Sequence, residues 1–230
     1  MTAVARKKQL PLPKLNDALN GVYVDFESNV GRDPTLLGIL LIDGSDGDVF
    51  EQHVIESGFE AAASAKGLKA GGHCVVSSPT DAVRRVIELA DGRRVFAYAA
   101  KHEQDLINEI PGGRELASSI EDVLPWARLW KRRMPQYRDV AFTKTPGSGR
   151  NSLRNMAALI DIGFSPFLGN RRVGPNLSRV RSQLESKGSW TDLPGGAKKA
   201  WSRVLRKNEW DCRTTRTLLC QIVEDLNPLR

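Results

Sequence analysis

Gly21-Val-Tyr-Val-Asp-Phe-Glu27 is the stretch that decides the fold of this 230-residue chain. Apolar side chains at positions 22, 24 and 26 alternate with Tyr23, Asp25 and Glu27. A period of two in residues that favour strands predicts a β-strand with two different faces. Asp25 and Glu27 are two residues apart, so this strand would present both carboxylates on the same face.

Two further strands are predicted directly after this one. Thr35–Ile42 is an apolar run that predicts a second strand, and Val49–Ile55 predicts a third. Between them Asp43-Gly-Ser-Asp-Gly-Asp48 has the composition of a turn, so the two runs predict a hairpin. Downstream, Ser78 followed by Pro79 is a helix start signal, and it predicts a helix that ends at Ala90 before Asp91-Gly92.

The remaining segments alternate helix and strand up to Ile110, and from Leu116 onward they are mostly helical. A break is expected at Pro125, so that Leu116–Arg133 forms one helix or two. The other predicted segments are a short helix Phe59–Lys66, a short strand or loop His73–Ser77, a fourth strand Arg94–Ala100, helices Lys101–Ile110, Asn151–Ile162, Asn176–Ser186, Ala197–Arg206 and Glu209–Leu226, and a loop Phe164–Pro175.

These elements predict one α/β domain over residues 18–230, in which an antiparallel hairpin and parallel strands share a mixed sheet flanked by helices. Residues 1–17 are basic and contain Pro11 and Pro13, so we expect them to be a flexible lead-in. No apolar run reaches the roughly 20 residues of a membrane span, and no secretory signal is visible. Three cysteines without a Cys-x-x-Cys pair predict packing thiols in the reducing cytoplasm.

Charge is divided unevenly along the chain. Residues 1–125 hold 13 basic and 19 acidic residues, whereas residues 126–230 hold 21 basic and 8 acidic ones. A C-terminal half with a net charge of +13 is a candidate surface for phosphate backbones. The alternative is an ordinary solvated basic surface.

Four acidic residues, at three places in the chain, are candidates for metal chemistry. Asp25 and Glu27 share a strand face, and Mg²⁺ prefers such hard carboxylate ligands. Asp211 would stand at the start of the last helix, and Glu103 follows the fourth strand beside His102. Each has a simpler explanation, namely solvated acids on an exposed strand or acids that favour the first turn of a helix. A capping or surface role is likewise expected for His102.

Five short motifs occur in order along residues 21–226: Val24-Asp-Phe-Glu27, Leu36-Leu-Gly38, Tyr98-Ala-Ala-Lys-His-Glu103, Ser152-Leu-Arg-Asn-Met156 and Asn208-Glu-Trp-Asp211-Cys-Arg-Thr-Thr215. Together they resemble the DEDD 3′–5′ exonuclease branch of the ribonuclease H-like superfamily, and within it the domains often fused to RecB-type nucleases. The resemblance implies a ribonuclease H-like fold in which Asp25, Glu27, Glu103 and Asp211 bind two Mg²⁺ or Mn²⁺ ions. Such a pair of ions would hydrolyse phosphodiester bonds of DNA or RNA at single-stranded ends.

Two positions depart from the family pattern. The second motif usually carries an aspartate, and here either Glu103 or Asp105 would take its place. The third motif usually has a tyrosine or histidine four or five residues before its aspartate, where this chain has Lys207 and Arg206. Lys207 would have to contact water or phosphate in place of the usual residue.

The basic half would hold the nucleic acid strand. Arginine contacts phosphate through a fork of donors, and six arginines lie between the second and third acidic motifs. Trp126, Trp130 and Trp190 could stack on bases, although Trp126 and Trp130 are one helical turn apart and fit a core equally well. The six arginines are Arg150, Arg154, Arg171, Arg172, Arg179 and Arg181.

Three functions are therefore open: a metal-dependent exonuclease, a catalytically degenerate domain that binds nucleic acid without cleaving it, and a protein-interaction domain. Four acids at matching places favour the first, and Lys207 favours the second. Salt-dependent binding would separate the second from the third, because phosphate contacts make affinity fall steeply with salt.

Overall fold

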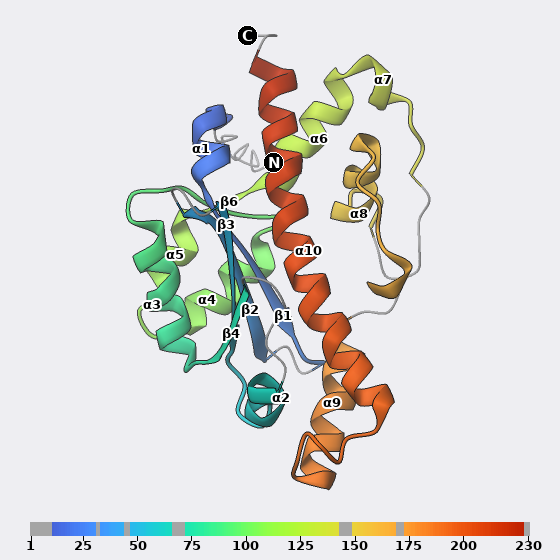
Figure 1. Ribbon diagram of the computed structural model, residues 1–230. Helices are drawn as coiled ribbons and strands as arrows, with labels where there is room; N and C mark the ends of the chain where they lie inside the picture. The colour runs from blue at the N-terminus through green and yellow to red at the C-terminus, as the bar shows by residue number, and fades with distance from the viewer. Residues whose placement is uncertain are drawn as a thin grey trace, which may run out of the picture.

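A six-stranded mixed sheet lies at the centre of the computed structural model, which describes residues 11–30, 33–43, 47–65, 72–142, 149–168 and 173–227 (Figure 1). The strand order is β4-β3-β2-β1-β5-β6. The strands are β1 (Val22–Ser28), β2 (Pro34–Asp43), β3 (Gly47–Val54), β4 (Gly72–Val76), β5 (Val95–Ala97) and β6 (Ile120–Asp122).

The predicted first strand lies inside the sheet, between the hairpin and the parallel strands. β1 runs antiparallel to β2 and parallel to β5, and β2 and β3 pair antiparallel as the predicted hairpin. β4 joins β3 in parallel, so the strand alternative for His73–Ser77 is confirmed, and β6 joins β5 in parallel. The predicted hairpin turn falls partly outside the described residues, at positions 44–46. In this register Asp25 is opposite Gly38.

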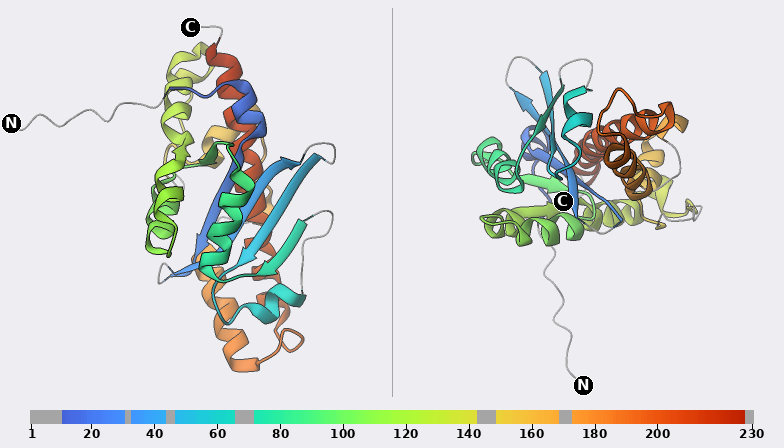
Figure 2. Two further views of the ribbon diagram at one scale, coloured as in Figure 1. Left: turned by 90° about the vertical axis from the view of Figure 1, so that its left-hand side faces the viewer. Right: turned by 90° about the horizontal axis from the view of Figure 1, so that it is seen from below.

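Helices cover both faces of the sheet. Figures 1 and 2 show α3, α4 and α5 on one side and the long α10 crossing the other. The helices are α1 (Leu15–Asn20), α2 (Glu60–Ala65), α3 (Pro79–Ala90), α4 (Lys101–Glu109), α5 (Arg114–Ser119), α6 (Val123–Arg133), α7 (Pro135–Arg138), α8 (Leu153–Ala157), α9 (Val173–Lys187) and α10 (Gly195–Leu226), with 3₁₀ turns at Ala158–Ile160 and Pro166–Leu168.

The alternation in β1 assigns each face of the sheet to its own core. Val22, Val24 and Phe26 pack with the buried side chains of α3, α4 and α5. Tyr23 points the other way, into a core formed with α6 and α10, and its hydroxyl donates to the carbonyl of Ala18 in α1. Asp25 and Glu27 share the Tyr23 face, so the sequence period directs both carboxylates toward α10.

The C-terminal part of the helical prediction is wrong in one respect. The two helices expected at Ala197–Arg206 and Glu209–Leu226 are one continuous helix, α10. No glycine or proline interrupts residues 197–226, and Asn208, which lies between the two expected helices, is a fully buried helical residue. Asp211 is therefore in the middle of a helix, and the electrostatics of a helix N-terminus do not account for its presence.

One strand prediction and one helix prediction also need correction. The fourth strand is only three residues long, because Tyr98–Ala100 form a turn in which Ala99 adopts φ 58°. The segment Leu116–Arg133 breaks at β6 rather than at Pro125, and Pro125 is accommodated in the first turn of α6, where its missing N–H costs no helical hydrogen bond. Three residues are too few to show a strand period in the sequence.

The helix α1 already begins at Leu15, so the segment predicted to be flexible up to residue 17 ends earlier. Residues 1–10 lie outside the described part of the chain. Ser78 caps α3 as predicted, and its hydroxyl accepts from the backbone N–H of Asp81 at 3.1 Å. Within the described residues no helix has both the length and the apolar character that a membrane crossing requires.

Candidate metal centre

Three carboxylates from the sheet and from α10 meet at one point. Asp25 and Glu27 come from β1, and Asp211 comes from the middle of α10. One oxygen of each side chain lies within 4.8 Å of the others, a spacing at which they could share a cation. Glu27 and Asp211 are each 8% exposed, and Asp25 is partly buried. Three carboxylates this close repel one another unless a cation compensates them.

A glycine allows the helix to approach the strand so closely. A Cβ atom on Gly38 would collide with the side-chain amide of Asn208 in α10. Asn208 fills that space, and its Nδ2 donates to the backbone carbonyl of Asp25 at 2.8 Å and to Asp25 Oδ2 at 2.9 Å. Two of the sequence motifs, Leu36-Leu-Gly38 and the Asn208–Thr215 segment, therefore meet beside Asp25, the acid of the Val24–Glu27 motif.

Gln52 completes the support of Asp25 and was not identified from the sequence. This fully buried residue of β3 donates from Nε2 to Asn208 Oδ1 at 2.9 Å and to the Leu205 carbonyl at 2.9 Å. The amide of Asn208 is thereby held with its N–H groups directed at Asp25. A polar side chain in a strand expected within the sheet was the available signal, since buried polar side chains need partners.

Lys207 brings a positive charge into the acidic cluster. Its Nζ donates to Asp211, one helical turn away, and lies 3.3 Å from Glu27 Oε1. The side chain is 28% exposed. The ammonium group therefore already compensates part of the cluster charge, at the position where the resembled family has a tyrosine or histidine.

The pKa values of the cluster reflect this mutual repulsion. Burial, together with the charges of Asp211 and Glu27, holds the pKa of Asp25 well above its usual range. Burial also raises the pKa of Glu27 to about 7, although Lys207 opposes the rise, and raises the pKa of Asp211. Burial alone would lower the pKa of Lys207, but Asp211, Glu27 and Asp25 outweigh it and hold that pKa well above its usual range. The acids are thus under-compensated by one ammonium group.

The two candidates for the fourth acid, Glu103 and Asp105, differ in their surroundings. Glu103 in α4 is 5% exposed, whereas Asp105 is exposed and pairs with Lys101. Burial, with smaller effects of Glu27, Asp122 and Asp211, raises the pKa of Glu103 to about 8. Glu103 therefore faces the same centre as the β1 and α10 acids, although it is not within the 4.8 Å group.

One oxygen of Glu103 is buried without a hydrogen-bond partner among the described residues. A buried, unpaired carboxyl oxygen is costly, and native structures seldom keep one without a ligand or water to satisfy it. Four carboxyl groups with one orphaned oxygen provide hard oxygen donors, which are the donors that Mg²⁺ and Mn²⁺ take. The residues present therefore fit a divalent cation.

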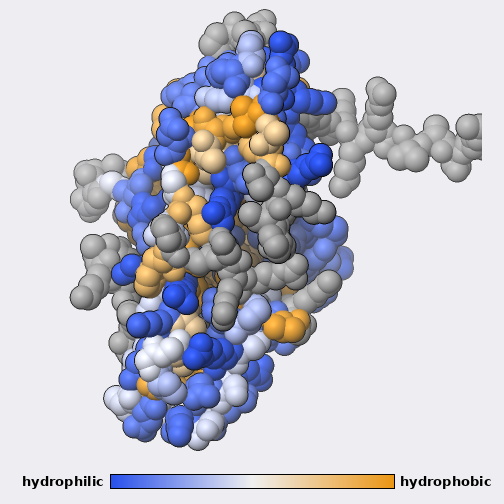
Figure 3. Space-filling model, turned by 90° about the vertical axis from the view of Figure 1, so that its right-hand side faces the viewer, coloured by the Kyte–Doolittle hydropathy of each residue, from blue (hydrophilic) through white to orange (hydrophobic). Residues whose placement is uncertain are grey.

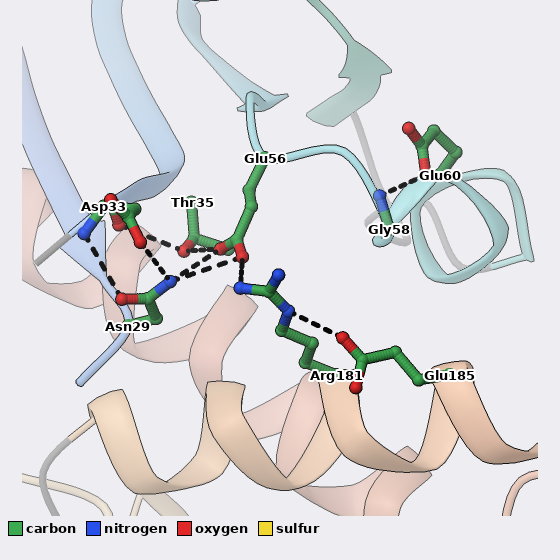
Figure 4. A network of polar contacts seen from close by, with 8 residues as sticks. All are labelled: Asn29, Asp33, Thr35, Glu56, Gly58, Glu60, Arg181 and Glu185. Carbon is green, nitrogen blue, oxygen red and sulfur yellow. Dashed lines mark hydrogen bonds and ion pairs between the residues drawn. The ribbon is translucent and has the colours of Figure 1, made fainter. Parts of the chain in front are cut away.

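Arg181 belongs to an ion-pair network rather than to an open surface (Figure 4). Its guanidinium donates to Glu56 Oε1 at 2.5 Å and to Glu185 Oε1 at 2.9 Å. Glu56 also accepts from Asn29 and Thr35, near the end of β1 and in β2. Arg181 thus ties α9 to the sheet, and two carboxylates already occupy its donors.

The other predicted phosphate-binding arginines that the structure describes lie in different surroundings. Arg154 is partly buried and lies over the ring of Phe164 at 4.6 Å, and Arg179 is exposed on α9. Arg150 is exposed and lines a cavity beside α6. Arg171 and Arg172 lie outside the described residues.

The tryptophans of α6 are core residues, as the alternative reading held. Trp126 is 2% exposed, and Trp130 is fully buried and donates from Nε1 to Asp225 Oδ2 at 2.7 Å. Trp190 is partly buried against the α9–α10 core. His102 is exposed, and its Nε2 lies 3.0 Å from Ser28 Oγ at the end of β1.

Comparison with family models, with curated proteins and with solved structures finds no match to this chain. The geometry of the acidic centre therefore has to carry the functional argument alone.

Proposed function

We propose that this protein is a divalent-cation-dependent nuclease that hydrolyses phosphodiester bonds of DNA or RNA, with the 3′–5′ exonuclease polarity that the family resemblance implies. The observation that carries the proposal is the acidic centre of Asp25, Glu27 and Asp211, with the buried carboxyl group of Glu103 close enough for the charges of Glu27 and Asp211 to raise its pKa. An antiparallel hairpin on one side of β1 and parallel strands on the other support the ribonuclease H-like assignment.

Asp25, Glu27 and Asp211 would hold Mg²⁺ or Mn²⁺, and Glu103 would contribute to a second ion. Such ions lower the pKa of bound water and neutralise charge on the phosphoryl oxygens. The side chains of this chain provide the fixed geometry that the reaction needs. Asn208 and Gln52 fix Asp25, which lies beside Asp211 and Glu27, and the helix α10 fixes Asp211.

Lys207 acts as a tethered cation within the same centre. In the absence of substrate it hydrogen-bonds Asp211 and lies beside Glu27, so it keeps the carboxylates together. With a phosphodiester bound, the ammonium group of Lys207 could turn from Asp211 and Glu27 to a phosphate oxygen, which would leave both carboxylates available as metal ligands. Positioned positive charge near the transferred group stabilises the charge that develops there.

A second candidate function follows from the same lysine. If the ammonium group keeps its carboxylates, it replaces a metal ion, and the protein binds nucleic acid without cleaving it. Metal binding and cleavage must therefore be measured separately.

The test uses single-stranded DNA and RNA labelled at the 3′ or the 5′ end, with Mn²⁺ or EDTA, and Mn²⁺ stoichiometry from electron paramagnetic resonance. We expect stepwise loss from the 3′ end that Asp25→Asn abolishes. Asp105→Asn is the matched control, because it makes the same chemical change in an exposed residue outside the cluster. Salt-sensitive nucleic acid binding with neither Mn²⁺ binding nor cleavage would instead support the second function, because absence of Mn²⁺ binding refutes the first.

A further inference from the structure

Four basic residues line a cavity of about 710 Å³ between α6 and the segments on either side of residues 143–148. They are Arg128, Lys131 and Arg132 from α6, and Arg150. No acidic residue is among the described residues that line it. A cavity that gathers positive charge without a compensating carboxylate is suited to an anionic ligand.

The sequence of α6 places these cations together on its outer side. One face of the helix is buried through Val123, Trp126 and Trp130. Arg128, Lys131 and Arg132 are spaced by three and four residues, so they share the opposite face. Like charges one helical turn apart destabilise a helix, and the helix contains no acid to offset them.

Three of the four cations have donors to spare. Within the described residues, the side chains of Arg128, Arg132 and Arg150 form no hydrogen bond or ion pair with a carboxylate. Lys131 donates to the Arg138 carbonyl at 3.2 Å and lies 4.9 Å from the centre of the Phe142 ring. Phe142 thus provides an apolar wall beside the charges.

Paired arginines elsewhere in the chain make this cluster distinctive. Arg85 pairs with Glu51, Arg94 with Glu121, and both Arg213 and Arg216 with Asp48.

Figure 3 shows the side of the molecule that carries α8, where hydrophobic residues form a patch among hydrophilic ones. An apolar wall beside guanidinium groups suits a ligand that has both phosphates and sugar or base surfaces.

The cavity borders the turn that positions Glu103. Tyr98, in the turn between β5 and α4, donates from its hydroxyl to the carbonyl of Asn151, which lines the cavity. Arg128 is close enough to Tyr98 for its charge to act on the phenol. The turn that contains Tyr98 therefore contacts a residue that lines the basic cavity, and it leads directly into α4, the helix of Glu103.

We propose that this cavity binds the phosphodiester backbone of the strand whose end enters the acidic centre. The inference deepens the proposed function and rests on it. Each guanidinium can grip phosphate oxygens through two N–H groups, which a solvated surface arginine would do less well. The cavity would bind phosphates away from the cleaved bond, so it would set affinity and the length of strand that binds well.

The experiment compares Arg128→Gln/Arg132→Gln with Arg84→Gln/Arg114→Gln, a control that removes the same charge from α3 and α5. Fluorescence anisotropy with labelled oligodeoxythymidylates of increasing length, in EDTA and at several salt concentrations, measures affinity without cleavage. We expect the cavity variant to bind long strands at least about tenfold more weakly. Its plot of log affinity against log salt should be shallower by about 1.4 units, for two lost phosphate contacts.

Short strands that do not reach the cavity should bind wild type and the cavity variant alike, and the control variant should match wild type at all lengths. Equal affinity of the cavity variant and wild type for long strands would overturn the proposal. A second result would also overturn the proposal: the cavity variant loses the binding of inorganic phosphate but keeps the wild-type affinity for long strands. Equal thermal unfolding of both double variants excludes misfolding. Because no metal is present, these outcomes do not depend on whether the protein cleaves.

Discussion

Replacing Glu103 by glutamine should change how the stability of the metal-free protein depends on pH. Burial raises the pKa of Glu103 from 4.5 to about 8 in the folded protein, and Glu27, Asp122 and Asp211 add to the rise. A carboxyl whose folded pKa lies above its unfolded pKa favours folding while it is protonated. Its contribution is complete below pH 4.5 and is lost as the pH rises through about 8.

The size of the effect follows from the shift. Between the two pKa values the unfolded chain releases one more proton than the folded chain, so the free energy of unfolding falls by about 1.4 kcal/mol per pH unit. From about pH 5 to pH 8 the contribution of Glu103 amounts to roughly 3 to 4 kcal/mol. Glutamine remains neutral, so Glu103→Gln should lack this loss.

Urea unfolding followed by tryptophan fluorescence in EDTA, at several pH values from about 5 to 8, measures the difference. Trp130 and Trp201 are fully buried, so their emission should report unfolding. Asp105→Asn should follow wild type, because Asp105 is exposed and paired with Lys101. Parallel curves for wild type and Glu103→Gln would refute the assignment of Glu103 to the buried acidic centre. Mn²⁺ should restore stability at the alkaline end in wild type more than in the variant.

Three further changes test other parts of the centre. Asp25→Asn should leave the protein folded in EDTA and abolish the Mn²⁺-dependent rise in melting temperature. For wild type this rise would correspond to about 2.7 kcal/mol at a Mn²⁺ concentration of a hundred times the dissociation constant. An unchanged rise would exclude Asp25 as a ligand. Lys207→Met leaves Asp211 and Glu27 without their cation, so the free energy of unfolding, measured with urea in EDTA, should fall by up to about 3 kcal/mol. Mn²⁺ should recover most of this loss. A gain in stability in EDTA would contradict this expectation. Gly38→Ala should cost about 1 to 3 kcal/mol in the same assay and weaken Mn²⁺ binding, because the new methyl group displaces Asn208; unchanged Mn²⁺ affinity would show that Asn208 does not position Asp25.

Local patterns in the sequence predict the hairpin and the helix α3 well. The period of two in β1 and the Ser78-Pro79 start signal are local features, and the structure realises both. The strand β6 could not be predicted, because three residues bounded by helices show no period. The continuity of α10 was missed because its middle is polar, and its polar residues are those that face the acidic centre rather than residues of a loop.

The candidate site was predictable only where the strand period or a motif marked it. Asp25 and Glu27 follow from their spacing, whereas the role of Gln52 depends on a contact with a residue 156 positions away. The sequence could not distinguish Glu103 from Asp105, because the two acids are two residues apart in the same helix. Only the structure shows that Glu103 is buried and that Asp105 is exposed. The basic cavity was not predicted because three of its four cations precede Arg150, the first of the arginines expected to bind phosphate. They lie on α6, a helix whose tryptophans mark its other, buried face.

The long helix α10 also sets when the acidic centre can exist during synthesis. The bond between Asn208 and Asp25 joins residues 183 positions apart, and ribosomes add about 5 to 20 residues per second. For roughly 10 to 40 seconds a nascent chain therefore has β1 and its hairpin without the helix that completes the centre. During that interval Tyr23, Leu40 and Phe50 lack their covering helix. The nascent chain then has no complete acidic centre and also exposes an apolar face of the sheet. Chaperone dependence should therefore be confined to nascent chains in which α10 has not yet left the ribosome.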